Sequence, residues 1–438
     1  MSTLPITNWR AQTTVFYGWY LAATLFLIMV FTGGIGFYVF PVFIASLHSG
    51  LGWSITQISG AIGLWAIVFG LSGPLVGAVS ERFGPRNTIL AGAALAALTA
   101  IGFASMSRLW MLYALQVPAG CSCAATTLVP GQTLITNWFK RHRGRAMAVM
   151  MMGLGAGGFA LPPLYEFVIR NLGWRACFAC GAVAMIGIVI PATVIFIRDL
   201  PSPLGLLPDG LKTLEISQTS HDTRFTGLPV SQAVRTLNFG LLLAIYLLQL
   251  VGMSVLNFHF IPFASIQAGF TAQQAALFLG IALGFSVVGQ FGFGWLADRF
   301  NPVILQAATG LLMALGVAAI ELGVIRVGSH DTSALWGYAV GYGLGLGGQN
   351  VLLPLLVGQC FGELHFSKIL GLMMGSFAIG VLVGIPVAGW SYDRFNTYEF
   401  AFLGCLALFL LSGALAMFIR ASRNRASFVS QSAVGAPA

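Results

Sequence analysis

The chain has 438 residues, of which 8% are charged and 57% are apolar, and its formal net charge is +9. A typical soluble domain has about 25% charged residues, so this composition excludes a soluble globular protein. The apolar residues come in separate blocks, and each block reaches the roughly 17 to 25 residues with which a helix crosses a bilayer. The composition therefore predicts an all-α, polytopic membrane protein.

Twelve membrane-spanning helices are predicted along the chain, with ends placed to within about two to four residues. In chain order they cover residues 17–46, 53–80, 86–107, 109–137, 146–169, 173–197, 236–264, 271–297, 302–326, 333–361, 368–391 and 398–420. Most links are short, so neighbouring helices run antiparallel. The long polar link divides the chain into an N-terminal six-helix bundle (1–198), a central loop (199–235), and a C-terminal six-helix bundle with a short tail (236–438).

Lysine and arginine are distributed unevenly between the predicted loops. With a cytoplasmic N-terminus, 16 of the 21 fall on the cytoplasmic side: Arg10, Arg82, Arg86, Lys140, Arg141, Arg143, Arg145, Arg198, Lys212, Arg224, Arg235, Arg299, Lys368, Arg420, Arg423 and Arg425. Cytoplasmic loops are enriched in these residues, so both termini are predicted to be cytoplasmic. Topology and anionic lipid headgroups account for the positive charge, and no nucleic-acid partner is predicted.

Patterns that would indicate an enzyme are weak in this chain. Cys177 and Cys180 form a CxxC, but without a second pair or a nearby histidine the pattern favours packing over metal or redox chemistry. "GLGLGG" (343–348) matches a dinucleotide motif only formally, because it lies inside a predicted span and not after a strand. No span offers a cluster of His, Asp or Glu. We therefore predict no catalytic residue, metal site or cofactor.

The two halves of the chain repeat each other. "GAVSERFG" (77–84) matches "GWLADRFN" (294–301), and "FYVFP" at 37 matches "FHFIP" at 258. Tyr38 and His259 are therefore equivalent positions in the repeat. Ser54 with Gln57, and Thr271 with Gln274, have the spacing of capping boxes that would begin the second and eighth spans.

The repeated loop resembles the signature of the major facilitator superfamily, and "WFKRHRGRAMAV" (138–149) is similar to that family's loop between spans four and five. The signature residues are Gly77, Glu81, Arg82, Gly84 and Arg86 in the first copy, and Gly294, Asp298 and Arg299 in the second, which has Asn301 in place of the second glycine. The resemblance implies two six-helix bundles around a central site. It also implies a conformational latch, in which Glu81 faces the start of span eleven and Asp298 faces the start of span five. The alternative is that these residues only set the topology.

Other segments resemble bacterial members of the monocarboxylate and oxalate/formate transporter group. They are "YGWYL" (17–21), "GWRACF" (173–178), "PLGLLPDG" (203–210) and "PVAGWSYDRF" (386–395). The resemblance implies a carrier of small organic anions in the bacterial cytoplasmic membrane, often coupled to protons. The chain departs from the group because span eight lacks Arg and Asp, span one lacks a deep Lys, and span eleven has only Lys368 at its inner edge.

In this superfamily spans one, four, seven and ten line the cavity, and these spans hold most of the deep polar residues. The candidate substrate-binding residues are Tyr38, Thr126, Thr127, Asn257, His259, Gln349 and Asn350. Buried polar groups in a membrane need partners, so they face protein or water. For Gln349 and Asn350 the alternative is interhelical hydrogen bonding. For the two threonines it is a hydrogen bond to their own helix backbone.

His259 is the candidate proton-coupling residue, because a reference pKa of about 6.5 allows an imidazole to be protonated near working pH. A protonated ring could attract a carboxylate and release its proton when the substrate leaves. The alternative is a neutral ring that is hydrogen-bonded across helices. Pro41 and Pro262 follow Tyr38 and His259 by three residues and are predicted to bend their helices.

Together these observations predict a secondary transporter that moves a small organic acid with a proton by alternating access. The sequence does not give the oligomeric state, and a monomer is expected. The expected partners are the organic anion, the proton and membrane lipid. An exporter or facilitator of neutral or amphipathic molecules is the alternative within transport. A receptor or regulatory membrane protein is the alternative from another class.

Overall fold

The computed structural model describes residues 16–210, 227–270, 272–326 and 332–420. Within them, twelve helices are long and apolar enough to cross a membrane, which confirms the predicted number. Ser54 and Gln57 form the predicted capping box, in which each side chain binds the other residue's backbone N–H. Thr271, in the second predicted box, lies outside the described residues.

The first six spans contain several departures from regular α-helix. The first span consists of α2 (Tyr17–Ile28), the π-helical segments Met29–Gly33 and Ile35–Val39, a 3₁₀ turn Phe40–Val42 and α3 (Phe43–Leu51). The second to fifth spans are α4 (Ile55–Phe83), α5 (Pro85–Ser105), α6 (Leu109–Thr126) with α7 (Leu128–Trp138), and α8 (Arg143–Leu172). The sixth span consists of α9 (Trp174–Ala184), the π-helical segment Met185–Val189 and α10 (Ile190–Phe196).

The last six spans repeat this plan after the short linker helix α11 (Val230–Ala233). They are α12 (Leu237–Pro262) with the π-helical segment Phe263–Gln267; α13 (Ala272–Ala297); α14 (Pro302–Ile320) with the π-helical segment Glu321–Arg326; α15 (Ser333–Phe361); α16 (Phe366–Met374) with α17 (Ser376–Phe395); and α18 (Glu399–Ala416).

The fourth span is broken, although the sequence predicted a continuous helix over 109–137. Thr127 has φ −111° and ψ −108° and separates α6 from α7. Pro130 lies in the first turn of α7 and has no N–H to donate to the carbonyl four residues earlier. The missing hydrogen bond contributes to the interruption at this point, although Pro74, Pro118 and Pro354 lie inside continuous helices.

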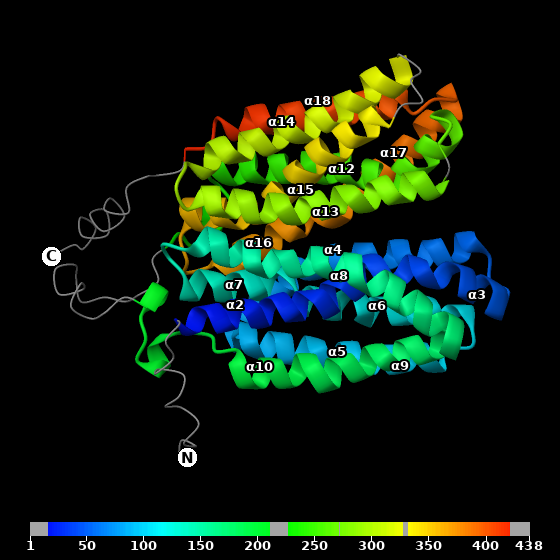
Figure 1. The fold of residues 1–438 in the computed structure, drawn as a ribbon. Helices are drawn as coiled ribbons and strands as arrows, with labels where there is room; N and C mark the ends of the chain where they lie inside the picture. The colour runs from blue at the N-terminus through cyan, green and yellow to red at the C-terminus, as the bar shows by residue number, and fades with distance from the viewer. Residues whose placement is uncertain (1–15, 211–226, 271, 327–331, 421–438) are drawn as a thin grey trace.

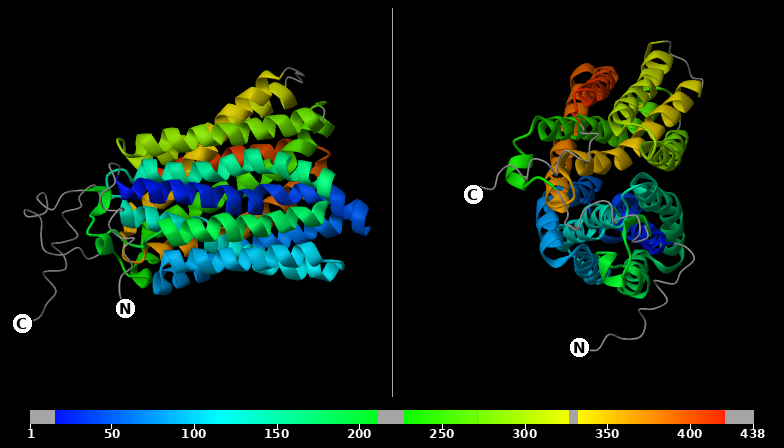
Figure 2. Two further views of the ribbon diagram at one scale, coloured as in Figure 1. Left: turned by 60° about the horizontal axis from the view of Figure 1, so that its bottom comes forward. Right: turned by 90° about the vertical axis from the view of Figure 1, so that its left-hand side faces the viewer.

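The spans form two bundles that lie against each other. The first six spans make up the lower bundle in Figure 1 and the last six the upper, and the end-on view in Figure 2 separates the two bundles clearly. The bundles meet where α4 packs on α16 and α17, and where α8 packs on α13. We call the end at which α2 begins and α18 ends the basal end, and the opposite end the distal end; α8 and α13 diverge toward the distal end (Figure 1).

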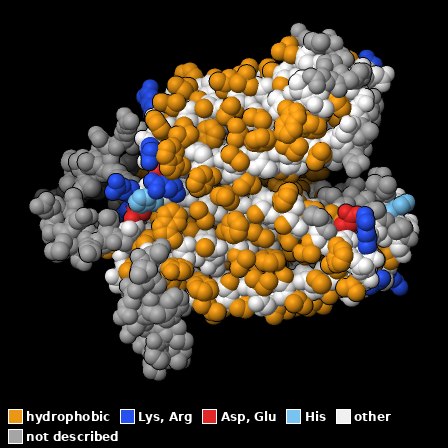
Figure 3. Space-filling view, in the orientation of Figure 1, with side chains coloured by type: hydrophobic (Ala, Val, Ile, Leu, Met, Phe, Trp, Pro, Cys, Tyr) orange, Lys and Arg blue, Asp and Glu red, His pale blue; other side chains and the backbone are white. Residues whose placement is uncertain are grey.

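The lateral surface is apolar, as expected for a chain that contacts lipid. Figure 3 shows hydrophobic side chains covering the sides of both bundles, with charged side chains at the two ends. Large apolar side chains, among them that of Phe159 with 82% of its surface exposed, remain accessible outside the bundle cores. In water such a surface would favour association, but in a bilayer it contacts acyl chains.

Candidate functional site

Glu81, near the end of α4, joins the two bundles at the basal end. Its Oε1 accepts a hydrogen bond from Lys368 Nζ at 2.8 Å and lies 2.9 Å from His365 Nδ1, both at the start of α16. Gly77 allows this approach, because a Cβ added there would lie 2.5 Å from the Ser367 carbonyl oxygen. We call the group of Glu81, His365 and Lys368 the Glu81 contact.

Asp298 follows α13 and makes the equivalent connection to the start of α8. Its carboxylate accepts hydrogen bonds from the backbone N–H groups of Gly144 (2.8 Å) and Arg145 (3.4 Å), and lies 3.0 Å from Arg145 Nε. A helix N-terminus favours negative charge because its first N–H groups are unpaired. We call the group of Asp298, Gly144 and Arg145 the Asp298 contact.

Burial also affects the Asp298 carboxyl. It raises the pKa of Asp298 above its ordinary value, while the Gly144 and Arg145 amides and the Arg145 charge act in the opposite direction. Gly294 and Gly144 allow the close packing that buries this group. A Cβ added at Gly294 would lie 2.6 Å from the Gly144 carbonyl oxygen.

A third cross-bundle connection was missed by the sequence analysis. Arg143, with 8% of its surface exposed, pairs with Glu363 just beyond α15. The same guanidinium donates to the carbonyls of Phe139 and Thr136. Arg143 belongs to the quoted segment 138–149, so the sequence contained a signal for the arginine but none that identified Glu363 as its partner.

The other signature residues do not join the bundles. The Arg86 backbone N–H donates to Asp199 Oδ1 at 2.8 Å, and Gly84 has φ +87° at a point where a Cβ would lie 2.5 Å from Asp199 Oδ2. These residues therefore tie the loop after α4 to the end of α10 within one bundle. The guanidinium groups of Arg82 and Arg299 are exposed and lie over the rings of neighbouring aromatic residues.

The central loop is attached to both bundles. Asp209 accepts hydrogen bonds from the backbone N–H groups of Lys140 (2.8 Å), Arg141 (2.6 Å) and His142 (3.3 Å), and its side chain is only 3% exposed. At the other side of the loop, the Leu228 N–H donates to the Phe361 carbonyl. Asp209 belongs to the "PLGLLPDG" segment, so the structure gives this segment a role in holding the turn before α8.

Two of the predicted substrate-binding residues, Asn257 and Gln349, lie along the face of α15 that carries Tyr342. The Tyr342 hydroxyl donates to Asn257 Oδ1 at 3.1 Å, which connects α15 to α12. Gln349 lies two helical turns from Tyr342 and so on the same face of α15. It is 1% exposed, and neither atom of its amide has a hydrogen-bond partner among the described residues. Asn350 is half-buried next to it.

Tyr38 and His259, the repeat equivalents, have different surroundings. Tyr38 packs on α8, where a Cβ added at Gly158 would lie 2.6 Å from the tyrosine ring. His259 lies in α12, is half-buried, and its Nε2 is 3.0 Å from the Ile385 carbonyl oxygen in α17. A carbonyl only accepts, so this nitrogen carries the proton.

Helical geometry changes at both predicted prolines. Pro41 lies in the 3₁₀ turn that separates the π-helical segment Ile35–Val39 from α3. Pro262 is the last residue of α12 and precedes a π-helical segment. The predicted bends at Pro41 and Pro262 therefore coincide with irregular backbone.

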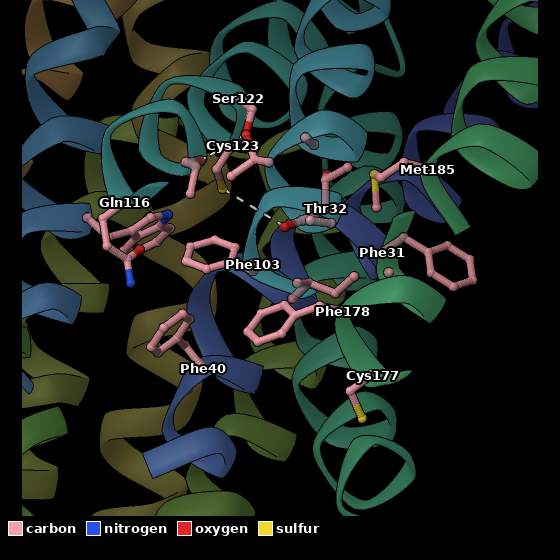
Figure 4. A pocket seen from close by; sticks show the side chains of 18 of the residues that line it. Phe31, Thr32, Phe40, Phe103, Gln116, Ser122, Cys123, Cys177, Phe178 and Met185 are labelled. Atoms are coloured by element: carbon pink, nitrogen blue, oxygen red, sulfur yellow. Dashed lines mark hydrogen bonds between the residues drawn. The ribbon is translucent and has the colours of Figure 1, made fainter. Parts of the chain in front are cut away.

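The two threonines of the fourth span bind their own backbone. Thr126 Oγ1 donates to the Ser122 carbonyl at 2.9 Å, and Thr127 Oγ1 to the Cys123 carbonyl at 2.6 Å. This is the arrangement that the sequence analysis gave as the alternative to substrate contact. Thr126 also lines a cavity of about 110 Å³ inside the first bundle (Figure 4). Among the residues that the structure describes, no group of three His, Cys, Asp or Glu side chains could hold a metal ion.

Comparison with known proteins agrees with this architecture. A family model described as the Major Facilitator Superfamily matches residues 25–362. The chain is 25% identical over 407 residues to monocarboxylate transporter 13 of Rattus norvegicus, covering 91% of this chain and 87% of the relative. It is 28% identical over 354 residues to monocarboxylate transporter 11 of Mus musculus, covering 78% and 73%.

Solved structures show the same fold at low sequence identity. The proton:xylose symporter XylE has a TM-score of 0.74 and 15% identity, over 92% of this chain and 96% of that one. The human organic anion transporter MFSD10 has a TM-score of 0.67 and 15% identity, over 91% and 97%. Because the family model and these folds span both bundles, the chain belongs to the major facilitator superfamily and is a transporter, not an enzyme.

Proposed function

We propose that this transporter moves a small monocarboxylate together with a proton by alternating access between its two bundles. Gln349 carries the proposal: its amide is buried in α15, lacks a partner among the described residues, and lies on the same face of α15 as Tyr342, which binds Asn257. An amide N–H can donate to a carboxylate, and an amide oxygen can accept from a substrate hydroxyl. The relatives named monocarboxylate transporters support this substrate class.

The basal end is proposed to face the cytoplasm. The Glu81, Asp298 and Arg143–Glu363 connections all lie at this end. Most of the chain's lysines and arginines belong to the loops predicted on the cytoplasmic side, which supports this orientation under the positive-inside rule. The described conformation would then be closed to the cytoplasm, with the two contacts acting as the latch. The proposed location is a bacterial cytoplasmic membrane, with both termini inside.

His259 is proposed to carry the coupled proton. Its Nε2–H is held by the Ile385 carbonyl, so Nδ1 is the nitrogen left to gain and lose a proton. The structural alternative is a ring whose only task is to link α12 to α17. Uptake at different pH values separates the two, because a merely structural ring would leave the pH profile unchanged.

Uptake of a panel of mono- and dicarboxylates into proteoliposomes, with and without a proton gradient, tests the proposal. We expect gradient-stimulated uptake of at least one monocarboxylate. Gln349→Leu should raise its KM by about tenfold or more, because a hydrogen bond to a charged group contributes about 1.5–3 kcal/mol. Gln232→Leu, at an exposed position in α11, is the matched control. No uptake of any carboxylate would overturn the proposal.

His259→Gln tests the proton step separately. The variant should fold and still transport, but lose acid-stimulated uptake, because an amide does not titrate. His48→Gln, at an exposed histidine, is the control. Acid stimulation that persists in His259→Gln would remove His259 from the mechanism and leave the monocarboxylate proposal standing.

Facilitated movement or export of neutral or amphipathic molecules is the second candidate. One observation favours it: spans one, four, seven and ten contain no lysine or arginine inside their described helices that could bind a carboxylate. Uptake of uncharged analogues that equals uptake of the acids, without an effect of the proton gradient, would support this candidate over the first.

A further inference from the structure

The first bundle contains a cavity that lies apart from the polar group of Asn257, Tyr342 and Gln349 proposed to bind the substrate. Its lining comes from spans one to six of that bundle, and its volume is about 110 Å³. Figure 4 shows Phe40, Phe103 and Phe178 around it, and the rings of Phe103 and Phe178 are stacked at 4.9 Å. Tyr342, Asn257 and Gln349 belong to the other bundle, so this cavity is distinct from the central polar group.

Gln116 in α6 lines this cavity, and both polar atoms of its amide are free to form hydrogen bonds with a ligand. Gln116 is 0% exposed, and neither its amide oxygen nor its amide nitrogen has a partner among the described residues. The hydroxyls of the serine and threonines that line the cavity already donate to backbone carbonyls. The hydroxyls of Thr32 and Thr99 donate to the carbonyls of Ile28 and Leu95. A buried amide without a hydrogen-bond partner costs free energy. A ligand that pairs with this amide removes that cost and is bound more tightly as a result.

The chemistry of the lining restricts the ligand. None of the described residues that line the cavity is charged, and most are aromatic or aliphatic. An ion would lose its hydration without compensation in such a place. An apolar cavity of roughly 150 Å³ admits benzene, so a single ring enters this smaller space if Met185, a flexible lining side chain, adjusts.

We propose that this cavity binds a small uncharged molecule, with one ring and one hydroxyl or amide group, whose polar group pairs with the Gln116 amide. The ring would lie against the aromatic side chains and the polar group would both donate to and accept from Gln116. Because the cavity lies within one bundle, such a ligand would not compete with the substrate. It would instead lower the maximal transport rate and leave KM unchanged.

Fluorine NMR of the full chain in phosphatidylcholine nanodiscs tests the proposal with three probes. They are 4-fluorophenol, 4-fluorotoluene without the hydroxyl, and 4-fluorobenzoate with a charge. Ala119→Leu fills the cavity, and binding is taken as the difference between the wild type and this variant, which subtracts partition into lipid. We expect saturable binding of the phenol, about tenfold weaker binding of the toluene, and none of the benzoate.

Gln116→Leu should remove the preference for the phenol over the toluene and leave toluene binding in place. If Gln116→Leu does not elute as a single folded species in size-exclusion chromatography, Gln116→Met replaces it. Ala100→Leu replaces Ala119→Leu in the same way. Equal phenol binding by the wild type and the filled variant would overturn the proposal. This is also the result expected if the cavity holds only water. An unchanged phenol preference in the Gln116 variant would overturn it as well. Benzoate binding that the filled variant loses would also overturn the proposal, because it would place a charged ligand in the cavity.

Discussion

Glu81 and Asp298 occupy equivalent positions in the two halves of the sequence, yet their carboxylates are bound by different groups. Glu81 is held by the side chains of His365 and Lys368, and its own side chain is 24% exposed. Asp298 is 7% exposed and accepts from the backbone amides at the start of α8, with Arg145 beside it. One contact therefore depends on flexible side chains, and the other mainly on a fixed helix end.

This difference predicts unequal strength. Ion pairs between partly exposed side chains contribute about 0–1 kcal/mol, because water screens them and long side chains lose freedom. A carboxylate that accepts from buried amides makes charge-assisted hydrogen bonds, which contribute about 1.5–3 kcal/mol each. We therefore expect the Asp298 contact to dominate closure of the basal end, with the Glu81 contact as a weaker second connection.

The largest effect is expected from breaking the close packing around the Asp298 contact. Gly294→Ala would place a Cβ 2.6 Å from both the Ala148 Cβ and the Gly144 carbonyl oxygen. The helices α8 and α13 would have to separate, and overpacking of this kind costs about 1–3 kcal/mol. We expect transport to fall more than tenfold. Uptake normalised to the amount of folded protein measures it.

Gly292→Ala is the matched control, because it lies in the same helix and a Cβ there meets nothing within 4 Å. It should transport at close to the wild-type rate. Equal losses in both variants would mean that the alanines act on α13 itself and not on its contact with α8.

Comparing single substitutions of the two carboxylates tests their unequal strength. Thr133→Cys in a cysteine-free background reports basal opening, because Thr133 is 7% exposed and its hydroxyl contacts Ser367 across the bundles. Asp298→Asn should raise its modification rate by about tenfold, and Glu81→Gln by about two- to threefold. Both together should shift the resting protein toward the basal-open state. A larger effect of Glu81→Gln would reverse the ranking of the contacts.

The sequence was sufficient for the spans because a bilayer imposes a length and an apolar composition on each helix separately. It was not sufficient for the break at Thr127, because many membrane helices absorb a proline such as Pro130 without interruption. The partners of Glu81 and Asp298 came from a family resemblance, since charge patterns along one chain do not say which helices are adjacent. The contact of Asp209 with the turn at Lys140 depends on the same missing information.

Hydrogen-bond partners inside the bundles were the least predictable part of the candidate site. Thr126 and Thr127 bind their own backbone, whereas Gln349 has no hydrogen-bond partner in the described part of the chain, although all three are polar residues deep in apolar spans. The difference arises from side-chain length and from which neighbour each helix face meets. The neighbour of each helix face depends on the tertiary structure and is not encoded in local sequence. Gln116 was missed for this reason, because one glutamine in an apolar span has no distinguishing pattern.

The smallest effect is expected from Asp209, which acts on only one of the two contacts. Its carboxylate holds the backbone at Lys140, Arg141 and His142, directly before the residues that bind Asp298. Asp209→Asn weakens these charge-assisted bonds, and we expect about a twofold rise in Thr133→Cys modification. Asp393→Asn, at an exposed carboxylate, is the control.

Double-mutant cycles make this last prediction specific. Asp209→Asn should couple to Asp298→Asn, because the turn and the carboxylate act on the same start of α8, and should add independently to Glu81→Gln. Equal coupling to both carboxylates would mean that the central loop acts on the bundles as a whole. Coupling to Asp298 alone would show that the loop reinforces the contact built on backbone amides and leaves the one built on side chains free to respond to its surroundings.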